Sequence, residues 1–212
     1  MHPLSPVKRK FPSILCEFAA LLFFLISGDM NLRAENRDTW QQPEKVMDVI
    51  GVKAGMVVGE IGAGEGYFTL KLARRVGAEG KIFANDIKRA ALDTLDAKCR
   101  KNGIRNVRTI LGKSDDPLFV PGSLDLAVMV YVLHEVTEPV SLLQRLKSAL
   151  KPGALLAVLD RDPAKYKADS GHFLAKKKMI ERIQMAGYAL IRDETFLPRD
   201  ALLLFRPDSE NK

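Results

Sequence analysis

Between residues 56 and 205 two patterns of hydrophobic positions alternate along the chain. Short apolar runs rich in branched residues predict strands, and windows with apolar positions at helical spacing predict helices. The predicted strands are 56–61, 81–85, 107–111, 124–132, 154–159, 188–192 and 201–205, and the predicted helices are 65–76, 88–101, 139–150 and 173–187. Strands that alternate with helices are typical of a parallel sheet covered on both faces. We therefore expect an α/β fold, a doubly wound and mostly parallel sheet of seven strands.

The last two predicted strands, 188–192 and 201–205, lie close together in the sequence. Parallel neighbours need a crossover of about a dozen residues or more, and the linker 193–200 is shorter than that. These strands should therefore form a C-terminal antiparallel hairpin. A nicotinamide-binding domain would end in a parallel strand, so the hairpin speaks against that class.

The first forty residues have a different composition. Basic residues at 8–10 precede an apolar run at 14–26, which is followed by small residues. This order is typical of a secretory signal peptide. The run is shorter than the ~20 residues that a membrane-spanning helix needs. We expect residues 1–34 to be a signal peptide or N-terminal hydrophobic segment, and residues 35–212 to form the folded domain.

Composition excludes several classes of site. The net charge is +7, but the basic residues of the helix 88–101 alternate with acidic ones and lack interleaved aromatic residues, so no specific nucleic-acid site is evident. Cys16 and Cys99 predict no disulfide within the folded domain. His134 and His172 are far apart in the sequence, and no ligand spacing predicts a metal site.

A glycine-rich loop follows the first predicted strand. Residues 62–66 are Gly-Ala-Gly-Glu-Gly, and glycines let a backbone turn sharply and approach a ligand closely. Tyr67 stands where a dinucleotide fingerprint needs its third glycine. Asp86, at the end of the second predicted strand, can accept hydrogen bonds from both ribose hydroxyls. Together these features favour a nucleoside site over the alternatives, a tight structural turn at the loop and a helix cap at Asp86.

Four segments resemble the class I S-adenosylmethionine-dependent methyltransferases. They are residues 58–66, Asp86, residues 124–127 and residues 150–154. The order of these motifs is most similar to that of small-molecule methyltransferases typified by quinone-biosynthesis enzymes. The resemblance implies a Rossmann-like methyltransferase fold with S-adenosylmethionine as the cofactor. The cofactor-binding residues that it implies are Glu60, Gly62, Ala63, Gly64, Gly66, Asp86, Ser114 and Asp115.

The implied roles follow the chemistry of the cofactor. Glu60 would hold the amino end, Gly62 and Gly64 would pass beneath the cofactor, and Asp86 would bind its ribose. Because the cofactor carries an ammonium and a sulfonium, a carboxylate beside the loop is favourable, whereas a phosphate-binding loop would avoid one.

The adenine position departs from the family pattern. Many relatives carry Gly-Asp-Ala before the fourth strand, and here residues 112–116 are Gly-Lys-Ser-Asp-Asp. The acid is displaced by two positions. We assign Asp115 to the adenine amino group, with Ser114 beside it, while Asp116 is equally suited to cap a turn.

Methyl transfer needs alignment of two reactants more than acid or base groups. A base helps where the acceptor must lose a proton, and His134, just after the fourth predicted strand, is the candidate. The alternative is that His134 caps the strand or the next helix. The acceptor should lie at the carboxyl ends of strands four and five. The residues expected there are Tyr131, His134, Glu135, Arg161, Tyr166 and His172. No lid domain is inserted, which favours a small-molecule acceptor.

Export conflicts with a cofactor that is made in the cytoplasm. Translation from Met30 would keep the folded domain and give a cytoplasmic protein, whereas an uncleaved segment would contact the membrane through residues 1–30. Two other functions remain open: an exported, noncatalytic nucleoside-binding protein and a nicotinamide-dependent oxidoreductase.

Overall fold

The computed structural model describes residues 37–166 and 171–208. The chain divides into two units, residues 1–39 and 40–212. The predicted signal segment lies outside the described residues. In the part of the chain that is described, no helix has both the length and the apolar character needed to cross a membrane.

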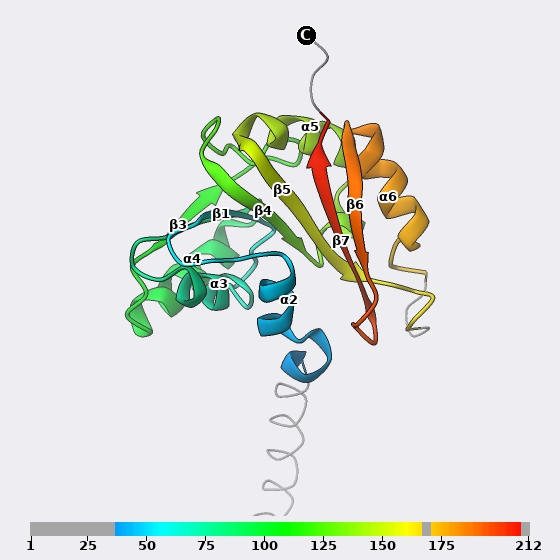
Figure 1. Cartoon of the computed structure of the whole chain (residues 1–212). Coiled ribbons are helices and arrows are strands. Elements are labelled where there is room, and N and C mark those ends of the chain that lie inside the picture. Colours follow the sequence, from blue (N-terminus) through cyan, green and yellow to red (C-terminus); the bar gives the residue numbers. More distant parts are fainter. Residues whose placement is uncertain (1–36, 167–170, 209–212) are drawn as a thin grey trace, which may run out of the picture. The chain divides into compact units, whose positions relative to one another are not determined.

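The second unit contains a seven-stranded sheet in the order β3-β2-β1-β4-β5-β7-β6 (Figure 1). The strands are β1 Val57–Ile61, β2 Lys81–Asp86, β3 Val107–Leu111, β4 Leu124–Val130, β5 Leu150–Arg161, β6 Tyr188–Glu194 and β7 Asp200–Pro207. The first five strands pair in parallel, and β7 pairs antiparallel with both β5 and β6. The predicted fold class and C-terminal hairpin are confirmed.

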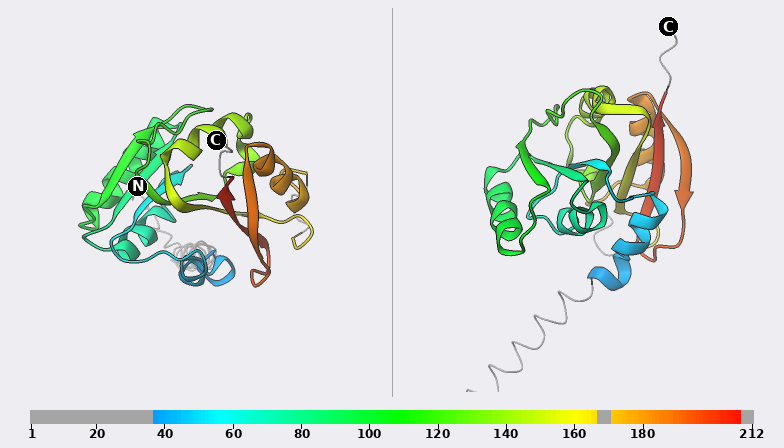
Figure 2. Two further views of the ribbon diagram at one scale, coloured as in Figure 1. Left: turned by 45° about the horizontal axis from the view of Figure 1, so that its top comes forward. Right: turned by 60° about the vertical axis from the view of Figure 1, so that its left-hand side comes forward.

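Helices cover both faces of the sheet (Figure 2). One face carries α2 Pro43–Val49, α3 Thr69–Val76 and α4 Arg89–Lys101, and the other carries α5 Pro139–Ala149 and α6 Lys176–Met185. Alternation along β4 feeds both cores, with Leu126 and Val128 packed on the first side and Ala127 and Met129 on the second. All four side chains are buried, as expected for a central strand.

Several element boundaries differ from the prediction, and two of them differ by four residues. Helix α3 begins at Thr69 rather than at residue 65, because Gly66 has a φ of +88° and the chain turns before a helix can start. Strand β5 begins at Leu150 rather than at residue 154. The pairing with β4 shifts register between Leu124 and Leu126, so the first residues of β5 join the strand through an irregularity.

The order in which the chain adds strands to the sheet reverses between β1 and β4. From β1 it proceeds outward to β2 and β3, then returns to place β4 on the other side of β1. In open α/β sheets such a switch point leaves a crevice at the carboxyl ends of the strands, where ligands bind.

Candidate active site

The glycine loop leaves the carboxyl end of β1. Gly62 and Gly64 have φ values of +70° and +54°, a region that favours glycine. A Cβ atom added to Gly62 would lie 2.1 Å from Val132 Cγ2, so this glycine allows the loop to pack against the chain after β4. A Cβ atom added to Gly64 would meet nothing within 4 Å. Gly64 therefore faces open space.

That space is a cavity of about 450 Å³ at the switch point of the sheet. Its wall includes Gly62 and Gly64 from the loop, Asp86 from β2, Ser114 from the segment after β3, and Tyr131 from the segment after β4. The structure thus brings four of the predicted cofactor-binding residues to one cavity.

The carboxylate of Asp86 organises this end of the sheet. Its Oδ2 accepts the Gly64 N–H at 2.8 Å, and its Oδ1 accepts the Lys88 N–H at 2.8 Å. Asp86 therefore fixes the glycine loop and the start of α4. Each carboxylate oxygen has a second lone pair, so a residue in this position can also accept bonds from a ligand in the cavity.

Three predicted residues support the loop without lining the cavity. Glu60 is 2% exposed, and its Oε2 accepts the Thr69 hydroxyl at 2.5 Å. The Ala63 N–H donates to the Asn85 carbonyl at 2.8 Å. A Cβ atom added to Gly66 would lie 2.3 Å from a Leu95 methyl group, so Gly66 permits close packing against α4. These residues shape the floor of the site.

Asp115 does not lie at the cavity. Its carboxylate forms an ion pair with Arg145 at 3.3 Å, whereas Lys113 and Ser114 are the residues of this segment in the cavity wall. Asp116 caps a turn, because its Oδ1 accepts the Leu118 N–H at 2.9 Å. The geometry therefore offers no support for Asp115 at the adenine, since its charge is compensated by a cation from α5.

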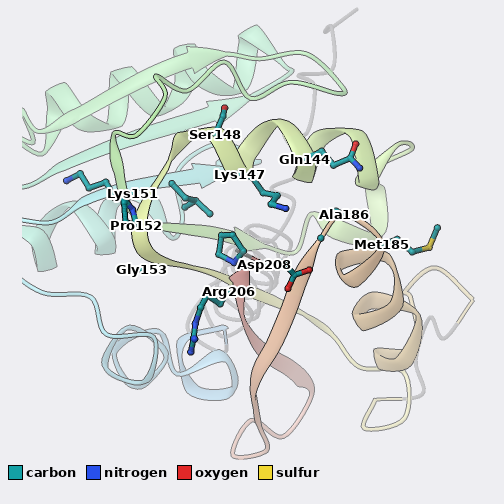
Figure 3. Close-up of a pocket in the computed structure, with 13 residues that line it drawn as sticks. Gln144, Lys147, Ser148, Lys151, Pro152, Gly153, Met185, Ala186, Arg206 and Asp208 are labelled. Carbon is teal, nitrogen blue, oxygen red and sulfur yellow. The ribbon is translucent and has the colours of Figure 1, made fainter. Parts of the chain in front are cut away.

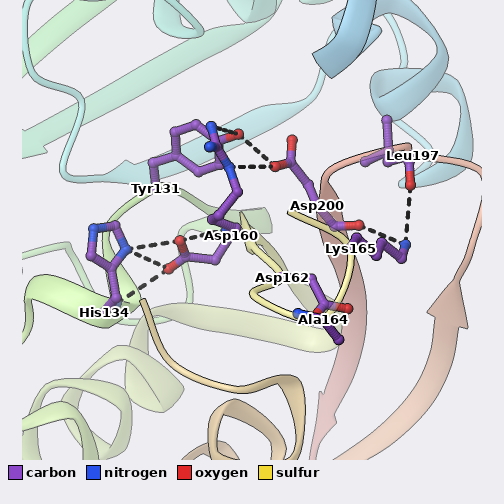
Figure 4. Close-up of polar contacts among 9 residues, drawn as sticks. Tyr131, His134, Asp160, Asp162, Ala164, Lys165, Leu197 and Asp200 are labelled. Atoms are coloured by element: carbon purple, nitrogen blue, oxygen red, sulfur yellow. Dashed lines mark hydrogen bonds and ion pairs between the residues drawn. The ribbon is translucent and has the colours of Figure 1, made fainter. Parts of the chain in front are cut away.

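His134 lies in a short 3-10 helix, η1 Leu133–Glu135, that follows β4. The Nδ1 atom of its ring lies 2.8 and 2.9 Å from the two carboxylate oxygens of Asp160 (Figure 4). The backbone N–H of His134 donates to Asp160 Oδ2 at 3.2 Å. Asp160 is fully buried at the end of β5. A carboxylate in this position fixes the proton on Nδ1 and leaves Nε2 as an acceptor. The interaction with Asp160 was not predicted, although an acid that ends an apolar strand is a recognisable signal.

A second polar cluster lies beside the first. Tyr131 has a φ of +59°, which is unusual for a bulky residue. Its hydroxyl donates to Asp200 Oδ1 at 2.6 Å and accepts from Arg161 at 3.1 Å (Figure 4). Burial raises the pKa of Tyr131 and raises the pKa of Asp200 to about 6. The tyrosine is thus held in a strained conformation by two charged partners, at the wall of the cavity.

Aromatic rings surround the Arg161 guanidinium. The ring centroids of Trp40, Tyr131, Tyr166 and Phe173 lie 4.7 to 5.3 Å from it. Trp40 and Tyr131 stack with their centroids 6.0 Å apart. The predicted acceptor residues Tyr131, Arg161 and Tyr166 therefore meet, and Trp40, from the segment before α2, joins them. Among these residues Tyr131 lines the cavity described above, so the cluster lies at the edge of that cavity.

Comparison with known proteins identifies the family. The sequence profile of the family described as "Methyltransferase domain" matches residues 52–189, which include the glycine loop, Asp86 and His134. The chain belongs to the class I S-adenosylmethionine-dependent methyltransferases. The predicted family and its cofactor, S-adenosylmethionine, are confirmed.

Individual relatives agree with this assignment. The methyltransferase is 34% identical over 115 residues to the ubiquinone/menaquinone biosynthesis C-methyltransferase UbiE of Idiomarina loihiensis, covering 54% of this chain and 46% of that one. It is 32% identical over 138 residues to the UbiE of Vibrio campbellii, covering 61% and 53%. The chain thus spans about half the length of these curated relatives.

Solved structures share the fold. A SAM-dependent methyltransferase from Aquifex aeolicus has a TM-score of 0.77 at 26% identity, covering 84% of this chain and 96% of that one. The [4+2]-cyclase SpnF has a TM-score of 0.68 at 15% identity, covering 79% and 80%, and shows the fold alone.

A larger cavity of the methyltransferase, about 1030 Å³, is lined by residues from α5, β5, α6 and β7 (Figure 3). Lys147, Lys151 and Arg206 line it together with Met185. It contains none of the predicted site residues, and it lies at the start of β5 and the end of β7, away from the carboxyl ends where ligands of this fold bind. Volume alone therefore does not identify the active site.

Proposed function

We propose that this methyltransferase transfers the methyl group of S-adenosylmethionine to a small, flat acceptor. The observation that carries the proposal is the cavity lined by Gly64 and Asp86 at the switch point of the sheet. A glycine with open space above it gives a ligand close access to the backbone, and the carboxylate offers acceptors for ribose hydroxyls.

Gly62 and Gly64 would hold the cofactor, Asp86 would accept hydrogen bonds from its ribose hydroxyls, and Ser114 would contact its adenine. Glu60 supplies negative potential from beneath the loop, where it stabilises the ammonium and sulfonium groups. This arrangement needs no direct contact with Glu60, because its charge acts through the buried floor of the site.

The acceptor is proposed to lie beside Tyr131 and the rings around Arg161. Methyl transfer is an in-line displacement in which the carbon–sulfur bond breaks as the acceptor bond forms, and the sulfonium becomes a neutral thioether. The names of the UbiE relatives refer to quinone biosynthesis, which supports a small aromatic acceptor here. The aromatic ring of Tyr131, in the wall of the cavity, supports the same class.

His134 is proposed as the base where the acceptor loses a proton. Asp160 holds Nδ1, so Nε2 is the atom that takes the proton. His134→Ala should then lower turnover about 100-fold or more and leave the affinity for S-adenosylmethionine unchanged. Equal turnover in the two proteins would make His134 a structural residue.

The first 34 residues are proposed to direct export. The basic and apolar regions described above support this proposal. The protein expressed in its own host with a C-terminal tag should begin between Gly28 and Asn36. A product that retains Met1, or that starts at Met30, would refute it.

Native mass spectrometry of freshly purified protein tests the proposed function. We expect a retained mass equal to S-adenosylmethionine or its demethylated product, and transfer of labelled methyl groups to small phenols. A fluorescence titration with reduced nicotinamide cofactor serves as the counter-test. Binding of that cofactor, without affinity for S-adenosylmethionine, would replace the proposal with an oxidoreductase, and affinity for neither would favour the noncatalytic reading.

A further inference from the structure

Two histidines and a glutamate meet at the rim of the cofactor cavity. One ligand atom from each of His134, Glu135 and His172 lies within 4.8 Å of the other two. The His134 Nε2 and Glu135 Oε1 atoms are 3.8 Å apart. The two imidazole rings meet edge to face with their centroids 5.1 Å apart. His172 comes from the segment before α6, so the fold unites residues that the sequence keeps far apart.

The first ligand is already oriented. The buried carboxylate of Asp160 holds His134 Nδ1, and this side chain of His134 is only 4% exposed. Histidines that bind metals usually donate their second ring N–H to a carboxylate or carbonyl, which fixes the tautomer and raises the basicity of the other nitrogen. His134 shows this arrangement, with Nε2 on the side of Glu135.

The remaining ligands are able to close on an ion. Glu135 and His172 are exposed, so their side chains can rotate without disturbing the core. Zinc–ligand distances of about 2.0 to 2.2 Å bring neighbouring ligands to roughly 3 to 3.5 Å from each other. The described separations require a movement of about 1 Å or slightly more, well within the reach of surface side chains.

We propose that His134, Glu135 and His172 bind one divalent transition-metal ion. Imidazole and carboxylate ligands together suit zinc, iron or cobalt, whereas magnesium and calcium prefer oxygen ligands alone. Three protein ligands leave at least one position open. Glu135 also lines the cofactor cavity, so the ion would lie beside the bound reactants.

The ion has a direct consequence for the reaction, and this part rests on the proposed function. A metal at Nε2 occupies the lone pair that would otherwise take a proton. An acceptor oxygen at the open position is then polarised by the ion instead. His134 would therefore act as the base in the metal-free enzyme, and the ion would take over the activation of the acceptor when it is bound.

A structural alternative exists for the same residues. Phe173 packs edge-on against His134 and His172, with centroids 4.5 and 5.0 Å away, and the three rings can form an aromatic cluster without an ion. The two alternatives differ in a measurable quantity, because the metal site predicts stoichiometric metal binding and the aromatic cluster does not.

The test uses the full chain without a polyhistidine tag, treated with chelator and then titrated with Zn²⁺ by calorimetry and with Co²⁺ by visible absorption. We expect one equivalent of Zn²⁺ and a Co²⁺ spectrum with nitrogen and oxygen ligands. His172→Ala and Glu135→Gln should weaken binding at least tenfold. Asp160→Asn should weaken it by about 10 to 100-fold, since the orientation of His134 is lost.

Glu138→Gln is the matched control. Glu138 is an exposed glutamate three residues after Glu135 and outside the cluster, so its substitution should leave Zn²⁺ affinity unchanged. Failure to bind one equivalent would overturn the proposal, as would equal binding in folded His172→Ala. The titration needs neither cofactor nor acceptor, so its result is independent of whether the chain binds S-adenosylmethionine.

Discussion

At the scale of single residues, the glycines of the loop are required for different reasons. Gly62 and Gly66 leave no room for a side chain, because neighbouring side chains of the protein occupy the space. Gly64 has room, but its backbone conformation and the cavity above it favour glycine. Packing within the protein explains Gly62 and Gly66, whereas a side chain at Gly64 would occupy space in the cavity.

Asp86→Asn tests the ribose assignment. The substitution removes the charge and one acceptor oxygen, and it should weaken S-adenosylmethionine binding by about 1 to 3 kcal/mol. Some loss of stability will accompany it, because Asp86 holds two backbone N–H groups. Calorimetry measures the affinity, and urea unfolding measures the stability.

Asp116→Asn provides the comparison for Asp86. Asp116 also accepts a backbone N–H and caps a turn, but it lies outside the cavity wall. The Asp116→Asn variant should have a lower free energy of unfolding and an unchanged affinity for S-adenosylmethionine. If Asp86→Asn behaves in the same way, its carboxylate is a structural cap and the ribose assignment is wrong.

Asp200 predicts a specific dependence of stability on pH. Burial raises the pKa of Asp200 from 3.8 to about 6, and its Oδ2 has no hydrogen-bond partner among the described residues. The folded state therefore binds this proton more tightly than the unfolded chain does. The stabilisation is present below about pH 4 and is lost as the pH rises through about 6.

Asp200→Asn should remove this dependence, because the amide does not titrate and its oxygen can still accept from Tyr131. Between pH 4 and pH 7 the free energy of unfolding of the variant should rise by about 1 to 3 kcal/mol relative to wild type. Urea unfolding at both pH values measures the difference. A constant difference between the two proteins would show that Asp200 does not titrate in this range.

Sequence predicted some site residues better than others. Gly62, Gly64 and Asp86 were predictable because strand, loop and acid occur in a fixed order near one another. The pairing of His134 with Asp160 depends on β4 and β5 being neighbours, and the pairing of Tyr131 with Asp200 depends on β7 being inserted beside β5. An acid at the end of an apolar strand, such as Asp160, can be recognised in the sequence, but its partner is set by tertiary structure.

At the scale of elements, the strand and helix order was predictable, and the ends were less so. The 3.6-residue period identified α3 but placed its start four residues too early, since Gly66 adopts a left-handed conformation that periodicity does not reveal. The end of α3 has another feature of this kind. Asn106, from the segment before β3, donates to the carbonyls of Ala73 and Gly77, both at 2.8 Å.

Asn106→Ala should destabilise the domain by about 1 to 3 kcal/mol, because two carbonyls at the end of α3 lose their donor. Asn102→Ala is a matched control. Asn102 is exposed and donates to one carbonyl, that of Lys98, at the end of α4, so its loss should cost about 0.5 kcal/mol or less. Equal losses in urea unfolding would show that Asn106 does not anchor α3 to the sheet.

At the scale of the whole molecule, topology positions the site. The switch between β1 and β4 opens the crevice, and the antiparallel β7 brings Asp200 to the side of β4 and β5 where Tyr131 lies. The fold was predictable because each step follows from local patterning and connection length. The acceptor was not, because it is selected by side chains from separate segments, such as Trp40 and Arg161, whose proximity only the folded chain defines.

The central claim is that S-adenosylmethionine binds over Gly64, and calorimetry on three full-length proteins tests it most directly. Gly64 and Gly103 have φ values of +54° and +66°, and a Cβ atom on either would meet nothing within 4 Å, so valine strains both backbones alike. Of these two glycines, Gly64 lines the cavity and Gly103 does not. Wild type and Gly103→Val should each bind one equivalent of S-adenosylmethionine, and Gly64→Val should bind none. Undiminished affinity in a folded Gly64→Val protein, or no affinity in wild type, would contradict the account.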